Sequence, residues 1–244
     1  MAKEIHPTAI ISPDVEIEED TYIGPFCIIH DKVHIKKGTR LISNVVIEGA
    51  TEIGENCTIY PFTSIGLPPQ DMKYKGEKTE VKIGNQNTIR EYITIHRASV
   101  SGDGITAIGD HNFLMAYVHI AHDCKIGNSV IMANLATLAG HVSIEDHAVI
   151  GGLVAIHQFT RVGAYTMVGG FSGVGQDIPP YMIASGARVK LFGLNTVGLK
   201  RHGFSDSTVN ELKKAYKILF REKRTLKDAI KKIQHTPGEK PVSQ

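Results

Sequence analysis

The stretch Val118–Cys124, VHIAHDC, places His119, His122 and Asp123 within five residues of one another. An imidazole titrates near neutral pH, so it can remove a proton from a hydroxyl group. A neighbouring carboxylate can hold the ring in one tautomer and stabilise the imidazolium that forms. Three imidazoles can instead bind zinc and leave one ligand position open for water. The residue types therefore indicate either general-base catalysis or zinc-dependent hydration.

The elements that must position these residues follow from a repeat. Aliphatic residues recur at every sixth position from Ile5 to Ile65, and the pattern returns after interruptions and runs to Val174. A small or β-branched residue stands two positions before most of them, so both side chains would face the same side of a short strand. A period of six does not fit a helix. It predicts a parallel β-helix, in which three hexads close each triangular coil.

The repeat also predicts where the histidines lie. Ile120, Leu138 and Ile156 are 18 residues apart, so they would stack on one face in successive coils. His141 and His157 follow the second and third of these aliphatics closely, as His122 follows the first. Because adjacent coils lie about 4.8 Å apart, we expect a column of imidazoles on one outer edge.

Glycine directly follows several of the aliphatics, as at Gly54, Gly127 and Gly163. Glycine adopts positive φ without steric cost, so we expect these residues to form the bends. Residues 66–80 and 96–107 lack the inward aliphatics and are rich in glycine and charge. They are interpreted as loops that leave the coil wall, where a rigid scaffold commonly binds its ligands.

The chain divides into two parts. Residues 1–180 are predicted to form the β-helix, and residues 181–244 a C-terminal helical domain. Ser205 begins one helical segment, and the capping pattern at Thr225 begins a second that ends near Gln234. The first part carries a net charge of −7 and the second +9, which suggests an acidic partner for the C-terminal domain.

Composition excludes several classes. Cys27, Cys57 and Cys124 follow no metal or redox spacing and are interpreted as reduced, buried thiols. The N-terminus resembles no signal peptide, and no run of 18 apolar residues occurs. We therefore expect a cytoplasmic protein without membrane insertion, and no nucleic-acid partner.

Several motifs in this order resemble those of a known family. They are QDMKYKGE, TIHRAS, HIAHDCKIGN, LAGHVSIEDHAVIGG, AIHQFTRVG and GLKRHGF. Together they are similar to the UDP-N-acetylglucosamine acyltransferases of lipid A biosynthesis. The resemblance covers nearly the whole chain, from about residue 5 to residue 234.

The resemblance implies a left-handed parallel β-helix with a C-terminal helical region, assembled as a homotrimer with active sites between subunits. It implies transfer of an (R)-3-hydroxyacyl chain from acyl carrier protein to the 3-position of UDP-N-acetylglucosamine. This is the first step of lipid A biosynthesis. Neither a cofactor nor a metal ion is implied. The acidic acyl carrier protein would suit the basic C-terminal domain.

The resemblance also implies roles for individual residues. His122 matches the general base, Asp123 its orienting partner, and Gly140 the residue whose backbone N–H stabilises the oxyanion. Gly170 falls where the acyl groove is measured, and its lack of a side chain suggests a long groove. The residues that match substrate contacts are Asp71, Lys73, His119, His141, His157, Gln158, Gly170, Asn195 and Arg201.

Two departures affect the nucleotide contacts. His202 stands where the best-known members have arginine, and Val197 where a carboxylate is expected near the uridine. Two alternatives remain open: a zinc-dependent hydratase of the carbonic anhydrase type, and an acyltransferase for another nucleotide sugar. The adjacent His122 and Asp123 favour an acyltransferase over the zinc-dependent hydratase.

Overall fold

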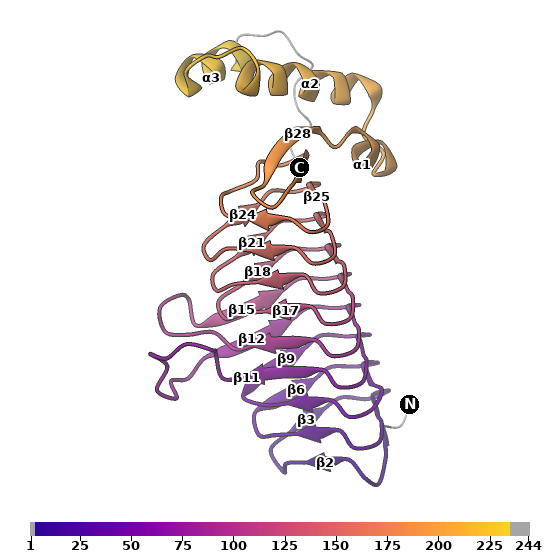
Figure 1. Ribbon diagram of the computed structural model, residues 1–244. Helices are drawn as coiled ribbons and strands as arrows, with labels where there is room; N and C mark the ends of the chain where they lie inside the picture. Colours follow the sequence, from indigo (N-terminus) through magenta and orange to yellow (C-terminus); the bar gives the residue numbers. More distant parts are fainter. Residues whose placement is uncertain (1–2, 235–244) are drawn as a thin grey trace.

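The computed structural model describes residues 3–234. Short strands follow one another around a triangular coil and stack into three parallel sheets (Figure 1). Sheet A contains β1 (Glu4–Ile5), β4 (Tyr22–Ile23), β7 (Arg40–Leu41), β10 (Thr58–Ile59), β13 (Thr88–Ile89), β16 (Phe113–Leu114), β19 (Ile131–Met132), β22 (Val149–Ile150), β25 (Met167–Val168), β27 (Met182–Ser185) and β28 (Lys190–Leu194). This arrangement confirms the predicted parallel β-helix.

The other two sheets form the remaining walls of the prism. Sheet B contains β2 (Ile10–Ile11), β5 (Ile28–Ile29), β8 (Val46–Ile47), β11 (Ser64–Leu67), β14 (Thr94–His96), β17 (His119–Ile120), β20 (Thr137–Leu138), β23 (Ala155–Ile156) and β26 (Gly173–Val174). Sheet C contains β3 (Glu16–Ile17), β6 (Val33–Ile35), β9 (Ala50–Ile53), β12 (Glu80–Ile83), β15 (Ile105–Ile108), β18 (Lys125–Ile126), β21 (Ser143–Ile144) and β24 (Arg161–Val162).

The core is the inside of the coil. From Ile23 onward the repeating aliphatics are buried, as Ile59, Leu114 and Ile120 illustrate with no exposed surface. The small residues two positions earlier are also buried, and Cys27, Cys57 and Cys124 are free thiols among them. Burying each large aliphatic side chain stabilises the fold by roughly 1.5–3 kcal/mol. The ladder between coils satisfies the backbone groups, so two-residue strands suffice.

The bends differ from the sequence expectation. Positive φ occurs at non-glycine residues three positions after the aliphatic, such as Phe26 and Leu135. Gly54 and Gly127 do not have positive φ; each lies too close to the next coil for a side chain. A Cβ on Gly54 would come within 2.4 Å of the Gly84 carbonyl oxygen. These glycines permit coil stacking rather than the turn.

Two loops leave the wall, as predicted. One connects β11 to β12 and the other connects β14 to β15 (Figure 1). The flanking strands extend into both predicted segments, so the loops are residues 68–79 and 97–104, shorter than 66–80 and 96–107. They start from successive coils, because β11 pairs with β14 and β12 with β15. The loops therefore rise side by side from the prism.

The C-terminal region begins with strands. β27 continues sheet A and pairs with antiparallel β28, and helices start only afterwards with α1 (Thr196–Arg201). The division at residue 180 stays a prediction. Helices α2 (Asp206–Phe220) and α3 (Leu226–Gln234) lie across this end of the coil (Figure 1). Their predicted starts are confirmed, because Ser205 and Thr225 accept hydrogen bonds from Thr208 N and Asp228 N.

Residues 1–2 and 235–244, which include the ends of both predicted domains, lie outside the described residues. Within the described chain, none of the helices combines the length and apolar character needed to cross a bilayer.

Candidate active site

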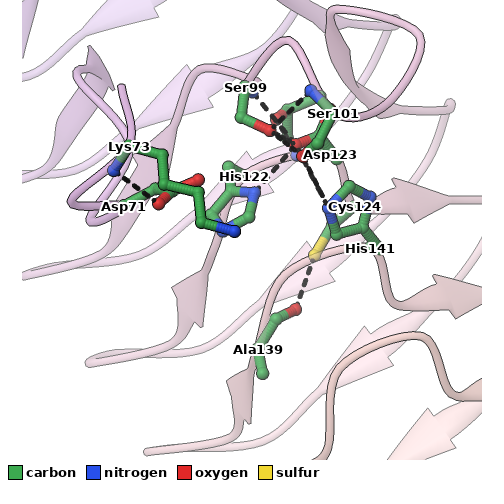
Figure 2. Close-up of polar contacts among 10 residues, drawn as sticks. Asp71, Lys73, Ser99, Ser101, His122, Asp123, Cys124, Ala139 and His141 are labelled. Carbon is green, nitrogen blue, oxygen red and sulfur yellow. Dashed lines mark hydrogen bonds and ion pairs between the residues drawn. The ribbon is translucent and has the colours of Figure 1, made fainter. Parts of the chain in front are cut away.

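His122 and Asp123 lie together in the bend between β17 and β18. Their contact joins His122 Nδ1 to Asp123 Oδ2 at 2.8 Å (Figure 2). The carboxylate is buried, with 3% of the side chain exposed, while 17% of the His122 side chain is exposed. A proton on Nδ1 donated to this carboxylate leaves the Nε2 lone pair free to accept another proton. The pair has the arrangement of a general base and its orienting group.

Gly140 lies beside the His122 ring. It occupies the same place one coil later, because Ile120 pairs with Leu138. A Cβ on Gly140 would come within 2.5 Å of His122 Cε1 and 2.7 Å of Nε2. Within residues 3–234, the Gly140 N–H donates no hydrogen bond. The absence of a side chain makes room for the ring.

His141 lies against the dyad from the next coil. Its ring is edge-on to the His122 ring at 5.2 Å, and its Nε2 lies 3.7 Å from Asp123 Oδ2. His122, His141 and His157 all lie at the corner between sheets B and C, as predicted, but they do not form a single column. Phe159, not His157, stacks on His141, at 4.6 Å. The three histidines stand two, three and one positions after their aliphatics, so they occupy different columns.

His157 and Gln158 lie farther along sheet B. His157 is exposed, and its Nδ1 contacts the carbonyl oxygen of Gln158 at 3.1 Å. His157 also lines an open groove of about 610 Å³ with residues that include Val174 and Arg188. The groove follows the edge strand β26, where sheet B ends.

A second histidine pair lies on sheet B beside the dyad. His119 Nδ1 contacts Thr94 Oγ1 at 2.7 Å, and the His96 ring packs edge-on to His119 at 5.2 Å. Burial, with His119 and His122 nearby, lowers the pKa of His96 to about 4. Burial and His122 also lower the pKa of His119. Both rings are therefore neutral at pH 7 and add no positive charge to the site.

Residues of the first loop lie on the same side as His122. Asp71 Oδ1 accepts a hydrogen bond from Lys73 N at 2.9 Å, and Figure 2 shows the Lys73 side chain extending toward His122. Arg97 fastens this loop to the wall. Its Nη1 donates to the Gly66 carbonyl oxygen at 2.7 Å, and its Nε donates to the Tyr74 hydroxyl at 3.1 Å. The second loop thus supports the first.

Three predicted contacts lie away from the dyad. The dyad occupies the corner between sheets B and C, whereas Gly170 is in the corner between A and B. Asn195 caps α1 by accepting from Gly198 N, and its Nδ2 donates to the Tyr165 carbonyl oxygen in the corner between C and A. Arg201 is exposed at the end of α1. One chain therefore does not gather all the predicted residues into one site.

His202 has a partner at this third corner. Its ring lies 4.8 Å from that of His147 and edge-on to Tyr165 at 5.2 Å. Burial, and then the proximity of His202, lowers the pKa of His147. The histidine that departs from the family motif therefore packs against the coil. Val197 is exposed on α1.

One group of side chains in the described residues has the proximity that a metal ion needs. Ligand atoms of His122, Asp123 and His141 lie within 4.8 Å of one another. However, Asp123 Oδ2 already accepts hydrogen bonds from Ser99 N, Ser99 Oγ and His122 Nδ1. A metal ion there would displace these donors, so the donor set fits the hydrogen-bonded dyad better.

Comparisons with known proteins agree with this geometry. The family model "Udp N-acetylglucosamine O-acyltransferase; Domain 2" matches residues 177–244, and "Bacterial transferase hexapeptide (six repeats)" matches residues 106–140. The acyl-[acyl-carrier-protein]--UDP-N-acetylglucosamine O-acyltransferase of Thermodesulfovibrio yellowstonii is 75% identical over 231 residues, covering 95% of this chain and 90% of the relative. The chain belongs to the UDP-N-acetylglucosamine O-acyltransferase family.

Solved structures of this family have the same fold. The UDP-N-acetylglucosamine acyltransferase from Campylobacter jejuni has a TM-score of 0.92 at 39% identity, covering 97% of this chain and 92% of that one. The Francisella novicida enzyme has a TM-score of 0.92 at 40% identity, covering 94% and 84%. The β-helix is left-handed, as the resemblance implied. Membership in this family overturns the zinc-hydratase alternative.

Sequence reasoning assigned no role to two residues in the site, His96 and Ser99. Both belong to the quoted motif TIHRAS. Thr94 pairs with His119 although the two are 25 residues apart, because the second loop intervenes. A search at 18-residue spacing therefore misses them. The signal that could have found them is the return of the aliphatic phase at Ile95 and Ile108.

Proposed function

We propose that this protein transfers an (R)-3-hydroxyacyl chain from acyl carrier protein to the 3-hydroxyl of UDP-N-acetylglucosamine in the cytoplasm, the first step of lipid A biosynthesis. The observation that carries the proposal is the 2.8 Å contact of His122 Nδ1 with buried Asp123, beside a glycine with a free N–H. The named relative at 75% identity supports the same reaction.

His122 acts as the general base in this mechanism. Its Nε2 takes the proton from the sugar hydroxyl while the hydroxyl oxygen attacks the thioester carbonyl carbon. Asp123 stabilises the imidazolium that forms. The tetrahedral intermediate collapses with cleavage of the carbon–sulfur bond. The imidazolium then returns its proton to the leaving thiolate, so His122 ends as it began.

Gly140 stabilises the charge that develops on the thioester oxygen. Its N–H is free within the described residues, and the residue itself lies against the His122 ring, near which that oxygen would form. Such a donor is fixed before the reaction and strengthens as the carbonyl becomes an oxyanion. Removing one donor of this kind typically costs about 10²–10³ in turnover.

The remaining site residues bind the two substrates. Asp71 and Lys73, on the loop beside His122, would contact the sugar, with His119 and His141 lining the cleft. His157 and Gln158 would line the continuation of the cleft along sheet B. Gly170 leaves the acyl groove open for a long chain. Asn195 and Arg201 would bind the nucleotide diphosphate.

The protein acts as a homotrimer with sites between subunits. The support is geometric: His122 and Gly170 lie at two different corners of one prism, and Asn195, just before α1, contacts Tyr165 at the third. Parallel prisms packed side by side would bring a corner of one chain to a different corner of the next. The dyad of one subunit would then meet the nucleotide-binding residues of its neighbour.

The C-terminal helices offer a surface for the acyl donor. α2 and α3 carry six lysines against three acidic residues, and residues 181–244 have a net charge of +9. Acyl carrier proteins are acidic, so opposite charge would steer their approach.

An acyl-transfer assay tests this function. Purified protein is given a panel of acyl carrier protein thioesters with UDP-N-acetylglucosamine or its 3-amino analogue. We expect transfer to the 3-hydroxyl, and a loss of about 10²–10⁴ in kcat for His122→Gln, the usual contribution of a general base. His30→Gln, at an exposed histidine in the early coils, is the control. Near-normal turnover by His122→Gln, or preference for the 3-amino acceptor, would reject the assignment.

A further inference from the structure

Ser99, on the second loop, makes two hydrogen bonds to the carboxylate of the dyad. Its backbone N–H donates to Asp123 Oδ2 at 3.0 Å and its hydroxyl donates to the same oxygen at 2.7 Å (Figure 2). Only 2% of Ser99 is exposed, so water does not replace these donors. With His122 Nδ1, three donors converge on one oxygen of Asp123.

The other carboxylate oxygen is isolated. Asp123 Oδ1 is buried and has no hydrogen-bond partner among the described residues. It faces Gly102 of the second loop, where a Cβ would come within 2.5 Å of it. A buried carboxylate oxygen without a partner is unfavourable. The carboxylate would therefore rotate unless the donors on Oδ2 held it, and rotation would break its contact with His122.

The hydroxyl of Ser99 belongs to a directed chain. Ser99 Oγ lies 2.6 Å from Ser101 Oγ, which lies 3.4 Å from His141 Nε2. Each hydroxyl has one proton to donate. Because Ser99 donates to Asp123, Ser101 must donate to Ser99. The chain thus directs its donors toward the carboxylate.

The second loop is itself fastened beside the dyad. Asp103 forms an ion pair with Lys125 on β18. On β15, directly after the loop, Thr106 Oγ1 accepts a hydrogen bond from Asp123 N at 2.9 Å. The loop therefore holds the side chain of Asp123, and the strand that follows it holds the backbone.

We propose that Ser99 is a positioning residue of the acyl transfer: it holds Asp123 in the orientation that keeps His122 ready to accept a proton. This role rests on the proposed function of His122 as the base. Ser99 need not touch either substrate. Its effect passes through Asp123, so it should change turnover much more than substrate affinity.

The first measurement compares Ser99→Ala with the wild-type protein. We expect kcat to fall about tenfold, because one hydrogen bond to a charged group is lost. KM for UDP-N-acetylglucosamine and the thermal unfolding midpoint should stay near the wild-type values. Ser43→Ala is the matched control, since its hydroxyl lies at another corner without a hydrogen-bond partner in the described chain. A kcat within twofold of wild type would overturn the proposal.

A double-mutant cycle then asks whether Ser99 acts through Asp123. In the Asp123→Ala background, Ser99→Ala should lower kcat by less than about twofold, because the group it positions is gone. A further tenfold loss in that background would show independent action and overturn the proposal. His122→Gln is measured in parallel. Near-normal turnover there would reject the proposed base, while non-additivity of Ser99 and Asp123 would still report on their coupling.

Discussion

His122 and Gly140 stand at equivalent places in successive coils, and the ring of the first fills the space that a side chain on the second would need. Gly140 therefore makes room for the His122 ring, and this steric role does not depend on its N–H. The His122 side chain and the Gly140 backbone come from neighbouring coils. They form one site because the repeat here is 18 residues without an insertion.

Gly140→Ala should displace the His122 ring. The added carbon would lie 2.5 Å from Cε1. The ring is only partly buried, so it would relieve this clash by moving away from its productive place. We expect kcat to fall by about 10²-fold, since misplacement of a reacting group by about 1 Å can cost that much. Steady-state kinetics and thermal unfolding measure it. The control is Gly152→Ala, a bend glycine whose Cβ would come no closer than 3.3 Å to a neighbour. Wild-type turnover by Gly140→Ala would contradict the steric role.

Arg97→Ala should weaken sugar binding more than turnover. Arg97 is only 17% exposed and joins the first loop to the wall through Gly66 and Tyr74. Without it the loop that carries Asp71 and Lys73 loses its hydrogen bond at Tyr74. We expect KM for UDP-N-acetylglucosamine to rise about tenfold, with kcat within about threefold of wild type. Arg40→Lys, in the N-terminal coils, is the control. An unchanged KM would show that the loop holds its place without Arg97.

Acid should destabilise the fold through His96. Burial lowers the pKa of this residue to about 4, so the unfolded chain binds a proton between pH 6.5 and 4 while the folded chain does not. The folded state therefore keeps its full stability with respect to His96 above pH 6.5, and loses stability as the pH falls toward 4. At pH 5 the loss is about 2 kcal/mol.

Urea unfolding at pH 8 and pH 5 checks this, with His96→Gln alongside. In the variant, the free energy of unfolding should differ between pH 8 and pH 5 by about 2 kcal/mol less than it does in the wild type. His6→Gln, at an exposed histidine, should keep the full difference. Equal pH dependence in the His96 variant and the wild type would mean that His96 is not the residue that titrates.

Two inactive variants should restore activity to each other if the site is shared. His122→Ala removes the proposed base, and Arg201→Ala removes a proposed nucleotide contact on α1. In mixed trimers from equal co-expression, about a quarter of the sites would combine a wild-type His122 with a neighbour's wild-type Arg201. We expect up to that fraction of wild-type turnover. Co-expression of two differently tagged His122→Ala chains is the control, and absence of recovery in the mixed pair would place the site within one chain.

The sequence predicted the wall of the prism well because each coil repeats the same chemistry. Aliphatics such as Ile59 and Leu114 are confirmed as the core, and the dyad residues are adjacent in sequence and meet in space. Helix starts at Ser205 and Thr225 were also predictable, since capping is a local interaction. Short-range and strictly periodic relationships were thus available from the residues alone.

Relationships between columns were not predictable in the same way. One residue of offset moves a side chain to another column, so Phe159 and not His157 stacks on His141. The second loop changes the spacing between coils, which concealed that Ser99 contacts Asp123. Glycine can serve either positive φ or close packing, and the sequence does not distinguish the two. Gly54 is a glycine because the next coil packs closely against it.

Two residues of the candidate site have backbone conformations that L-amino acids disfavour. Asp123 and His141 both have φ of 61°, and none of the non-glycine residues with positive φ between residues 3 and 234 is β-branched. The neighbouring coils impose that conformation, so it does not depend on the side chain that happens to be there. Such corners can exchange one functional group for another while the winding persists. A scaffold of this kind separates the evolution of reactivity from the evolution of shape.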